Sequence, residues 1–338
     1  MRVQCWLLSK EVFMTKRMVK RIGAAVLAAV MITCMGAASL TMAAGKYDVP
    51  FITRIPLKDK LTKAIDEAGT LETITYTTPL FGVDETQETE KTLQVYLPYG
   101  YDPAQQYNVV YLMHGGGESE YYWLNNEPVY EGTKAMGKTT RAVIDNMIAD
   151  GKIAPAIFVA PTFITGEDTA PEDWTRFARE FREVIVPLVE SKYSTYTGGD
   201  VSADNLVATR EHRGFAGFSM GSRCTVNSIL MNDLDIVAWY GCYSGPDPSL
   251  GGAGAEEVKA AIESFGPDMP IRYLYNGNGT SDFELEGHSE LAHGLLETMP
   301  DTFRDGENWC WIEFKGGSHA YNCWIADLYN TMLVFFQE

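Results

Sequence analysis

Five residues, Gly217-Phe218-Ser219-Met220-Gly221, constrain the fold of this chain more than any others. A short β-prone segment, 214–216, precedes them, and a segment able to form a helix, 222–232, follows. Gly-x-Ser-x-Gly between a strand and a helix is typical of a strained turn that exposes its serine above a sheet. Such a pentapeptide also occurs in ordinary turns, so the surrounding sequence must show whether Ser219 is catalytic. In the right context Ser219 is a nucleophile and the N–H of Met220 points toward a forming oxyanion.

Residues 1–44 differ from the rest of the chain. Basic residues precede the apolar run 22–40, namely Lys10, Lys16, Arg17, Lys20 and Arg21. The small residues around Ala43 and Ala44 suit signal peptidase. We therefore expect a signal peptide over 1–44, cut near Ala43 to Gly45, and a secreted or extracellular protein. An uncleaved membrane anchor is the alternative, because the apolar run approaches spanning length.

Charge restricts the partners of the mature chain. Residues 1–44 hold six of the 27 basic and one of the 45 acidic residues, so 21 basic and 44 acidic residues remain, a net charge of −23. Such a surface repels nucleic acid and anionic lipid, which favours a neutral substrate or a neutral polymer. Oligomeric state stays open.

The cysteines and histidines of the mature chain are not spaced like zinc ligands, so we expect no metal site. Export permits disulfides, but buried free thiols are at least as compatible with the apolar surroundings of the cysteines. The four cysteines are Cys224, Cys242, Cys310 and Cys323.

Periodicity predicts an α/β fold. Alternating residues indicate half-exposed antiparallel strands at 71–78 and 92–97, and apolar runs indicate buried strands at 108–113, 156–160, 214–216, 236–243, 271–275 and 309–314. Helical spacing predicts helices at 139–150, 177–192, 222–232, 255–265, 289–299 and 324–336, and another at 58–68 within a leader, 45–70. This alternation predicts one domain over 71–338: a doubly wound, mostly parallel sheet of about eight strands with helices on both faces.

A serine nucleophile requires a base, and the base requires a carboxylate. His319 lies in the glycine-rich segment between the last strand and the last helix, where a catalytic base is expected. We call the turn at 217–221 the elbow, and the strand before it, 214–216, the elbow strand. His212 precedes the elbow strand and is interpreted as a surface residue, and His288 and His293 are interpreted as solvated residues. His114 begins the Gly115-Gly116-Gly117 run, where we expect it to hold the loop.

The acid is expected after the strand that lies between the elbow and His319. The turn-forming segment 276–282 ends in Asp282, which we predict to be the acid, with Glu284 and Glu286 as rivals. The resulting order of serine, acid and histidine is that of α/β hydrolases. In that fold the loop after an early strand supplies a second oxyanion donor, here the N–H of Gly116, with Gly115 as the alternative.

With these residues placed, the chain resembles the bacterial feruloyl esterases and acetyl xylan esterases, carbohydrate esterase family 1 or the esterase D type. The resemblance is carried by segments 96–101, 111–117 with Trp123, 145–153, 210–221, 279–282 and 316–324. Two departures stand out: Ala320 replaces the acidic residue that commonly follows the histidine, and Ser222-Arg223 replaces a pair of small residues.

The resemblance implies a secreted serine carboxylic-ester hydrolase that acts on feruloyl or acetyl esters of xylan through an acyl-enzyme, with no cofactor. Tyr122, Trp123 and Trp324 are candidates for substrate binding, or else aromatic residues of the core or of a lid. Other acyl hydrolases or transferases on this fold stay open, such as a peptidase, a mycolyl-type transferase or a siderophore esterase. So does a catalytically silent carbohydrate-binding protein.

Overall fold

The structure, a computed structural model, describes residues 49–127, 132, 134–164 and 173–337. The predicted signal peptide, 1–44, lies outside the described residues. Residues from 45 onward form one compact unit. No helix within the described ranges has the length and the hydrophobicity that crossing a bilayer requires.

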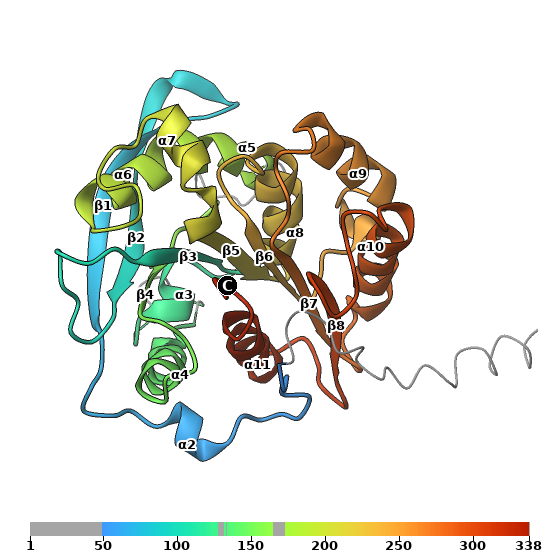
Figure 1. Cartoon of the computed structure of the whole chain (residues 1–338), viewed down its shortest axis with the longest axis horizontal. Helices are drawn as coiled ribbons and strands as arrows, with labels where there is room; N and C mark the ends of the chain where they lie inside the picture. Colours follow the sequence, from blue (N-terminus) through green and yellow to red (C-terminus); the bar gives the residue numbers. More distant parts are fainter. Residues whose placement is uncertain (1–48, 128–131, 133, 165–172, 338) are drawn as a thin grey trace, which may run out of the picture. The chain divides into compact units, whose positions relative to one another are not determined.

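An eight-stranded sheet forms the centre of the described fold (Figure 1). Its strand order is β1-β2-β4-β3-β5-β6-β7-β8. β1 pairs antiparallel with β2 and β2 antiparallel with β4, and all the other neighbours are parallel. The predicted α/β class, with a mostly parallel sheet, is confirmed. The strands are β1 (Thr70–Leu80), β2 (Asp84–Leu97), β3 (Asn108–Met113), β4 (Ala156–Ala160), β5 (Arg213–Phe218), β6 (Trp239–Tyr243), β7 (Tyr273–Gly279) and β8 (Trp309–Phe314).

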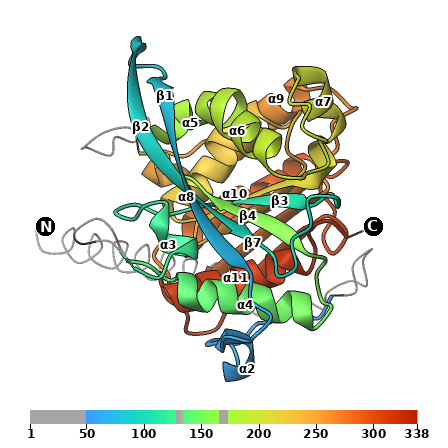
Figure 2. The ribbon, with the colours of Figure 1, turned by 90° about the vertical axis from the view of Figure 1, so that its left-hand side faces the viewer.

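Helices cover both faces of the sheet. α4 and α11 lie on one face, and α5, α6, α8, α9 and α10 lie on the other (Figures 1 and 2). A π-helical segment, Phe181–Ile185, joins α5 to α6, and another, Cys224–Leu230, continues α8. The α-helices are α2 (Asp59–Thr62), α3 (Tyr121–Leu124), α4 (Gly137–Ala149), α5 (Asp173–Glu180), α6 (Val186–Lys192), α7 (Ala203–Ala208), α8 (Met220–Arg223), α9 (Ala255–Ser264), α10 (Leu285–Thr298) and α11 (Tyr321–Met332).

The solid apolar runs are explained by two hydrophobic cores, one on each face of the sheet. Successive side chains of a strand point to opposite faces. In β3, Val109, Tyr111 and Met113 therefore enter the core under α5 and the segment after α8, whereas Val110 and Leu112 enter the core under α4 and α11. A central strand buried on both faces cannot alternate apolar with polar residues, and the run at 108–113 shows this.

The ends of several predicted elements shift by a few residues, and two predictions differ more than that from the observed structure. The helix predicted at 58–68 is only α2, because Leu61 is buried while Ala64 and Ala68 are exposed, so most of the apolar face has no packing partner. The segment 276–279, predicted as a turn, continues β7. Its glycines are needed for close contacts: a Cβ on Gly277 would lie 1.7 Å from Oδ1 of Asp327 on α11.

The four cysteines of the described chain are buried free thiols. Burial raises the pKa of Cys242, Cys310 and Cys323 to about 12, so these groups stay uncharged near neutral pH. They act as small apolar side chains of the core.

Candidate active site

Ser219 lies on a strained turn between β5 and α8. Its backbone has φ 55° and ψ −121°, a left-handed conformation that is rare for a residue with a Cβ. The Ser219 N–H donates to the carbonyl of Tyr243 on β6 at 2.9 Å, and the Ser219 carbonyl accepts from Ser222 N–H at 2.9 Å. The neighbouring strand and the start of the helix thus hold the turn, and the side chain is half-buried.

Glycines allow the turn to pack tightly. A Cβ on Gly217 would lie 2.5 Å from the carbonyl oxygen of Gly221, and a Cβ on Gly221 would lie 2.4 Å from the carbonyl oxygen of His114. A Cβ on Gly116 would lie 2.3 Å from Sδ of Met220. The loop after β3 therefore lies directly against the elbow. That the N–H groups of Gly116 and Met220 converge on one oxyanion stays a prediction.

His319 and Asp282 meet at the carboxyl ends of β8 and β7. The Nδ1 atom of His319 lies 2.9 Å from Oδ1 of Asp282. The Asp282 side chain is fully buried, whereas a fifth of the His319 side chain is exposed. Neither rival occupies this position, since Glu286 is exposed and the carboxylate of Glu284 pairs with Arg223.

The surroundings of Asp282 favour its charged form. Burial alone would raise its pKa, but hydrogen bonds from His319, from the Glu284 N–H at 2.9 Å and from Ser244 outweigh it, so the pKa lies below its usual value. Ser244 accepts a hydrogen bond from Nε1 of Trp324 at 2.8 Å. An ionised Asp282 is suited to orient an imidazole and to balance its charge.

Among the described residues, no hydrogen bond joins the Ser219 hydroxyl to His319. An aromatic layer connects them instead: Phe218 stacks on Trp324 at 3.9 Å between ring centroids, and Trp324 meets the edge of His319 at 5.2 Å. Catalytic hydrogen bonds are often long without substrate. The Asp282–His319 half of the predicted arrangement is thus present, and the Ser219–His319 contact stays a prediction.

His114 holds the loop after β3, as predicted. Its Nε2 atom lies 2.7 Å from the Thr162 hydroxyl and its Nδ1 atom 2.8 Å from the carbonyl of Gly115, and its ring stacks on Phe163. Burial lowers the pKa of His114 to about 4, so the ring is neutral. Thr162 follows β4, and nothing in the sequence pattern pointed to it.

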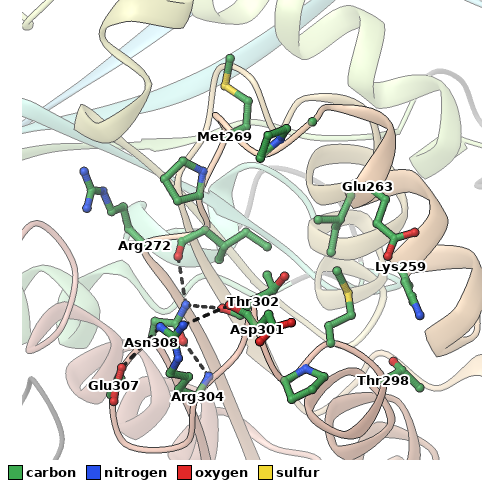
Figure 3. A pocket seen from close by; sticks show the side chains of 17 residues that line it. Lys259, Glu263, Met269, Arg272, Thr298, Asp301, Thr302, Arg304, Glu307 and Asn308 are labelled. Carbon is green, nitrogen blue, oxygen red and sulfur yellow. Dashed lines mark hydrogen bonds and ion pairs between the residues drawn. The ribbon is translucent and has the colours of Figure 1, made fainter.

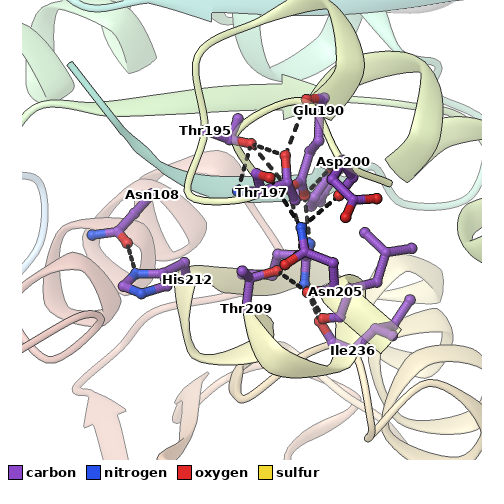
Figure 4. Close-up of polar contacts among 12 residues, drawn as sticks. Asn108, Glu190, Thr195, Thr197, Asp200, Asn205, Thr209, His212 and Ile236 are labelled. Carbon is purple, nitrogen blue, oxygen red and sulfur yellow. Dashed lines mark hydrogen bonds and ion pairs between the residues drawn. The ribbon is translucent and has the colours of Figure 1, made fainter. Parts of the chain in front are cut away.

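The remaining histidines lie away from Ser219 or below the surface. His212 precedes β5 and contacts Asn108 through Nδ1 at 2.8 Å (Figure 4), but it is half-buried under Tyr196 rather than on the open surface. The interpretation of His288 as solvated is wrong: it is fully buried and Nδ1 lies 2.8 Å from Oδ1 of Asn278. His293 is half-buried against Trp309 and Trp311. Both face inward because α10 packs on the sheet.

The three aromatic candidates for substrate binding are all buried. Trp123 is fully buried and donates Nε1–H to the carbonyl of Met113 at 3.0 Å, and Tyr122 is 1% exposed. Trp324 is 8% exposed between Phe218 and His319. Tyr122 and Trp123 offer no open ring face to a substrate, because both rings pack inside the protein against Phe218, next to Ser219. Direct stacking on them is therefore not supported, and Trp324 alone reaches the site.

Two features of the site were missed from the sequence. Arg223 on α8 forms a buried ion pair with Glu284, at 2.5 Å, which ties the elbow helix to the segment that carries Asp282. Phe283, between the two acids, has a side chain that is 67% exposed and packs on His319. The unusual Ser222-Arg223 pair was the available signal for the first, and an aromatic residue beside the predicted acid was the signal for the second.

A large pocket lies away from this site. It has a volume of about 840 Å³ and lies between the ends of α9 and α10 and the amino ends of β7 and β8 (Figure 3). In its wall, the side-chain amide Nδ2 of Asn308 donates hydrogen bonds to the carbonyls of Ile271 and Thr302. Ser219, Asp282 and His319 lie at the opposite, carboxyl edge, where ligands bind in sheets of this type. No cluster of metal-ligating side chains occurs within the described ranges.

Comparisons with known proteins agree with this geometry. A family described as putative esterase matches residues 85–250. Endo-1,4-beta-xylanase Y of Acetivibrio thermocellus is 40% identical over 293 residues, which cover 84% of this chain and 24% of that protein. The chain thus spans about a quarter of that relative's length.

Solved structures show the same similarity. One is a serine-to-alanine mutant of the feruloyl esterase module from Clostridium thermocellum, complexed with sinapinate. It has a TM-score of 0.71 and 29% identity, and the match covers 85% of this chain and 95% of that one. A protein called FAE has a TM-score of 0.70 and 30% identity with the same coverage.

Proposed function

Because the chain belongs to the carbohydrate esterase family 1 type of α/β-hydrolase esterases, we propose that it hydrolyses feruloyl or acetyl esters carried by xylan. The match to the putative esterase family and the similarity to feruloyl esterase structures support a carboxylic ester hydrolase. One observation supports the proposal above all: the hydrogen bond between buried Asp282 and His319, at the sheet edge that also carries strained Ser219. The xylanase and feruloyl esterase relatives suggest the polymer and the acyl group.

In the proposed reaction, His319 takes the proton of the Ser219 hydroxyl while the oxygen attacks the ester carbonyl. Asp282 fixes the imidazole through Nδ1 and balances the imidazolium charge. The tetrahedral intermediate collapses, His319 gives its proton to the leaving alcohol, and the acyl group stays on Ser219. Water, deprotonated by His319, then releases the acid and restores the serine.

The N–H groups of Met220 and Gly116 are the proposed donors to the oxyanion. The close packing of the Gly116 backbone on the Met220 side chain supports this proposal, because it places the loop after β3 against the turn that carries Ser219. Preorganised donors of this kind contribute roughly 100- to 1000-fold each to turnover, because they do not have to reorganise as charge develops. His114, held between Gly115 and Thr162, keeps the loop in place.

We also infer that the protein is exported. The charged, apolar and small-residue order of residues 1–44 supports this. A polymer such as xylan is too large to enter a cell whole, so an enzyme acting on it is useful only outside the cytoplasm.

Four substrates test the proposed function: methyl ferulate, acetylated xylan, p-nitrophenyl acetate and a peptide anilide. We expect turnover of one or more esters and none of the anilide. Ser219→Ala and Asp282→Asn should each lower kcat on the best ester by about 10³-fold or more, since triad members act together. Steady-state kinetics and circular dichroism measure turnover and folding.

Matched variants control for nonspecific damage. Ser264→Ala alters an exposed serine at the end of α9, and Glu286→Gln alters the exposed rival acid, so both should keep wild-type turnover. Full ester turnover by Ser219→Ala would refute the nucleophile. If the wild-type protein bound xylan but hydrolysed no ester, it would be a binding protein and not an enzyme. Cleavage of the anilide alone would indicate a peptidase.

A further inference from the structure

Phe283 is the most exposed large hydrophobic side chain of the described chain. Its side chain is 67% exposed, more than Val83 at 61% or Tyr99 at 56%. A single exposed apolar residue is ordinary on a protein surface and carries no conclusion by itself. Phe283 differs from such a residue because it lies between two buried acids, Asp282 and Glu284, whose side chains are held by hydrogen bonds and an ion pair. Its exposure is therefore fixed by its neighbours.

The Phe283 ring packs on the proposed base. Its centroid lies 4.4 Å from that of His319, with the ring planes tilted by 36°. One side of the ring is thus in contact with the imidazole while most of its surface is open. The backbone on each side cannot shift easily: Glu284 N–H binds Asp282, and the Glu284 carboxylate is anchored to Arg223.

The chemistry of the reaction determines which part of the substrate lies near this ring. His319 must reach the leaving oxygen to protonate it, so the alcohol portion of the ester departs next to the imidazole. A ring in van der Waals contact with that imidazole therefore borders the alcohol portion. The oxyanion donors, by contrast, belong to the loop after β3 and to the elbow.

The alcohol portion of an ester on xylan is a sugar. The C–H groups on a sugar face are apolar and slightly positive, and an aromatic face is apolar and carries the negative part of the ring quadrupole. The net charge of −23 over residues 45–338 disfavours an acidic ligand, which agrees with a neutral sugar.

We infer that Phe283 is a binding platform for the sugar ring that carries the ester, on the alcohol side of the scissile bond. This inference rests on the proposed esterase function. It assigns recognition of the sugar to the acid loop, by which we mean the segment 280–284 that carries Asp282. Tyr122, Trp123 and Phe218, by contrast, support the elbow and are closed to solvent.

Two esters of the same acid, one with a sugar at the leaving oxygen and one without, distinguish sugar binding by Phe283 from other roles of this ring. Methyl ferulate has no sugar, whereas a feruloylated arabinoxylan oligosaccharide presents one at the leaving oxygen. Phe283→Ala should lower kcat/KM on the oligosaccharide about ten-fold and on methyl ferulate less than about two-fold, in line with one aromatic contact. Phe283→Trp should keep the activity on the oligosaccharide.

Tyr99→Ala is the matched control. Tyr99 is 56% exposed and follows β2, which runs antiparallel to β4, so it lies at the opposite edge of the sheet. Its removal should change neither rate. An equal loss on both esters in Phe283→Ala would show that the ring only positions His319, and no loss on either would show that it has no role; each result overturns the inference.

A binding measurement makes the test independent of turnover. The same arabinoxylan oligosaccharide without its feruloyl group is titrated into Ser219→Ala and into Ser219→Ala/Phe283→Ala, and binding is followed by NMR shifts. We expect about ten-fold weaker binding in the double variant. If the wild type hydrolyses no ester, the proposed function fails, yet this titration still decides whether Phe283 binds sugar; equal affinities would refute the platform.

Discussion

Strain and burial at single residues mark the site. Ser219 has a backbone conformation that a residue with a Cβ rarely adopts, and Asp282 is buried with Oδ1 bound by His319 and by the Glu284 N–H. Both arrangements cost stability unless their surroundings hold them. The same holds for His288, which is buried beneath the acid loop and hydrogen-bonded to Asn278.

His288 should make the fold sensitive to acid. Burial lowers its pKa to about 3. Below its ordinary pKa, about 6.5, the unfolded chain binds a proton that the folded protein does not, so its contribution to stability is present above pH 6.5 and is lost as the pH falls toward 3. Between pH 7 and pH 5 this one residue should lower the free energy of unfolding by about 2 kcal/mol.

Urea unfolding of the wild type and of His288→Gln at pH 7 and pH 5 checks this. The substitution should reduce the pH-dependent change in the free energy of unfolding by about 2 kcal/mol, because glutamine does not titrate. Any constant cost of the substitution cancels in the difference between the two pH values. An identical pH dependence in both proteins would exclude His288 as the source.

At the scale of elements, the site depends on segments that meet only in the fold. α8 begins directly after Ser219, and the segment before α10 carries Asp282. The buried pair Arg223–Glu284 joins the two, with both side chains at most 5% exposed. Burial raises the pKa of Glu284, and Arg223 opposes this in part. This pair should keep the acid loop in register with the elbow.

Breaking the pair should damage both stability and turnover. Arg223→Met or Glu284→Gln leaves a buried group without its partner, and each should cost about 3–5 kcal/mol of unfolding free energy. The double variant Arg223→Met/Glu284→Leu should cost clearly less than the sum, since no charge is left buried. We also expect a lower kcat with nearly unchanged KM, because the Asp282 carboxylate loses its anchor.

Arg179 and Glu85 provide a control, because they form an exposed pair at 2.6 Å. Arg179→Met should change the unfolding free energy by no more than about 1 kcal/mol. If the variants of the buried pair were no less stable than this control, the pair would not anchor the acid loop.

At the scale of the whole molecule, the proposed export rests on the charged, apolar and small-residue order of residues 1–44. Mass spectrometry of the natural product should find a mature amino terminus near Ala44 or Gly45, because the small residues there suit signal peptidase. Culture medium and cell fractions are compared, with a cytoplasmic enzyme as the control for lysis. Peptides from 22–40 in the mature protein would indicate an uncleaved anchor.

Local patterns were sufficient to predict the α/β class, most strands and the Asp282–His319 pair. Solid apolar runs identify buried strands, and Gly-x-Ser-x-Gly identifies a turn whose glycines have no room for a Cβ. Loops at the carboxyl ends of parallel strands lie at one edge of the sheet, so the proximity of Asp282 and His319 could be predicted although their distance could not.

Contacts between distant segments were decided by the tertiary structure alone. The segment 276–279 looks like a turn, but it is a strand because it pairs with β8 along its length and with β6 at 276 and 277; its glycine at 277 leaves room for Asp327 of α11. His288 looks solvated among charged neighbours, but one face of α10 turns it into the core. Whether Trp123 or Phe283 meets a substrate depends on which ring is left uncovered when the helices and loops pack together. Periodicity along a chain records the preference of each residue for burial, but not which surfaces finally cover it.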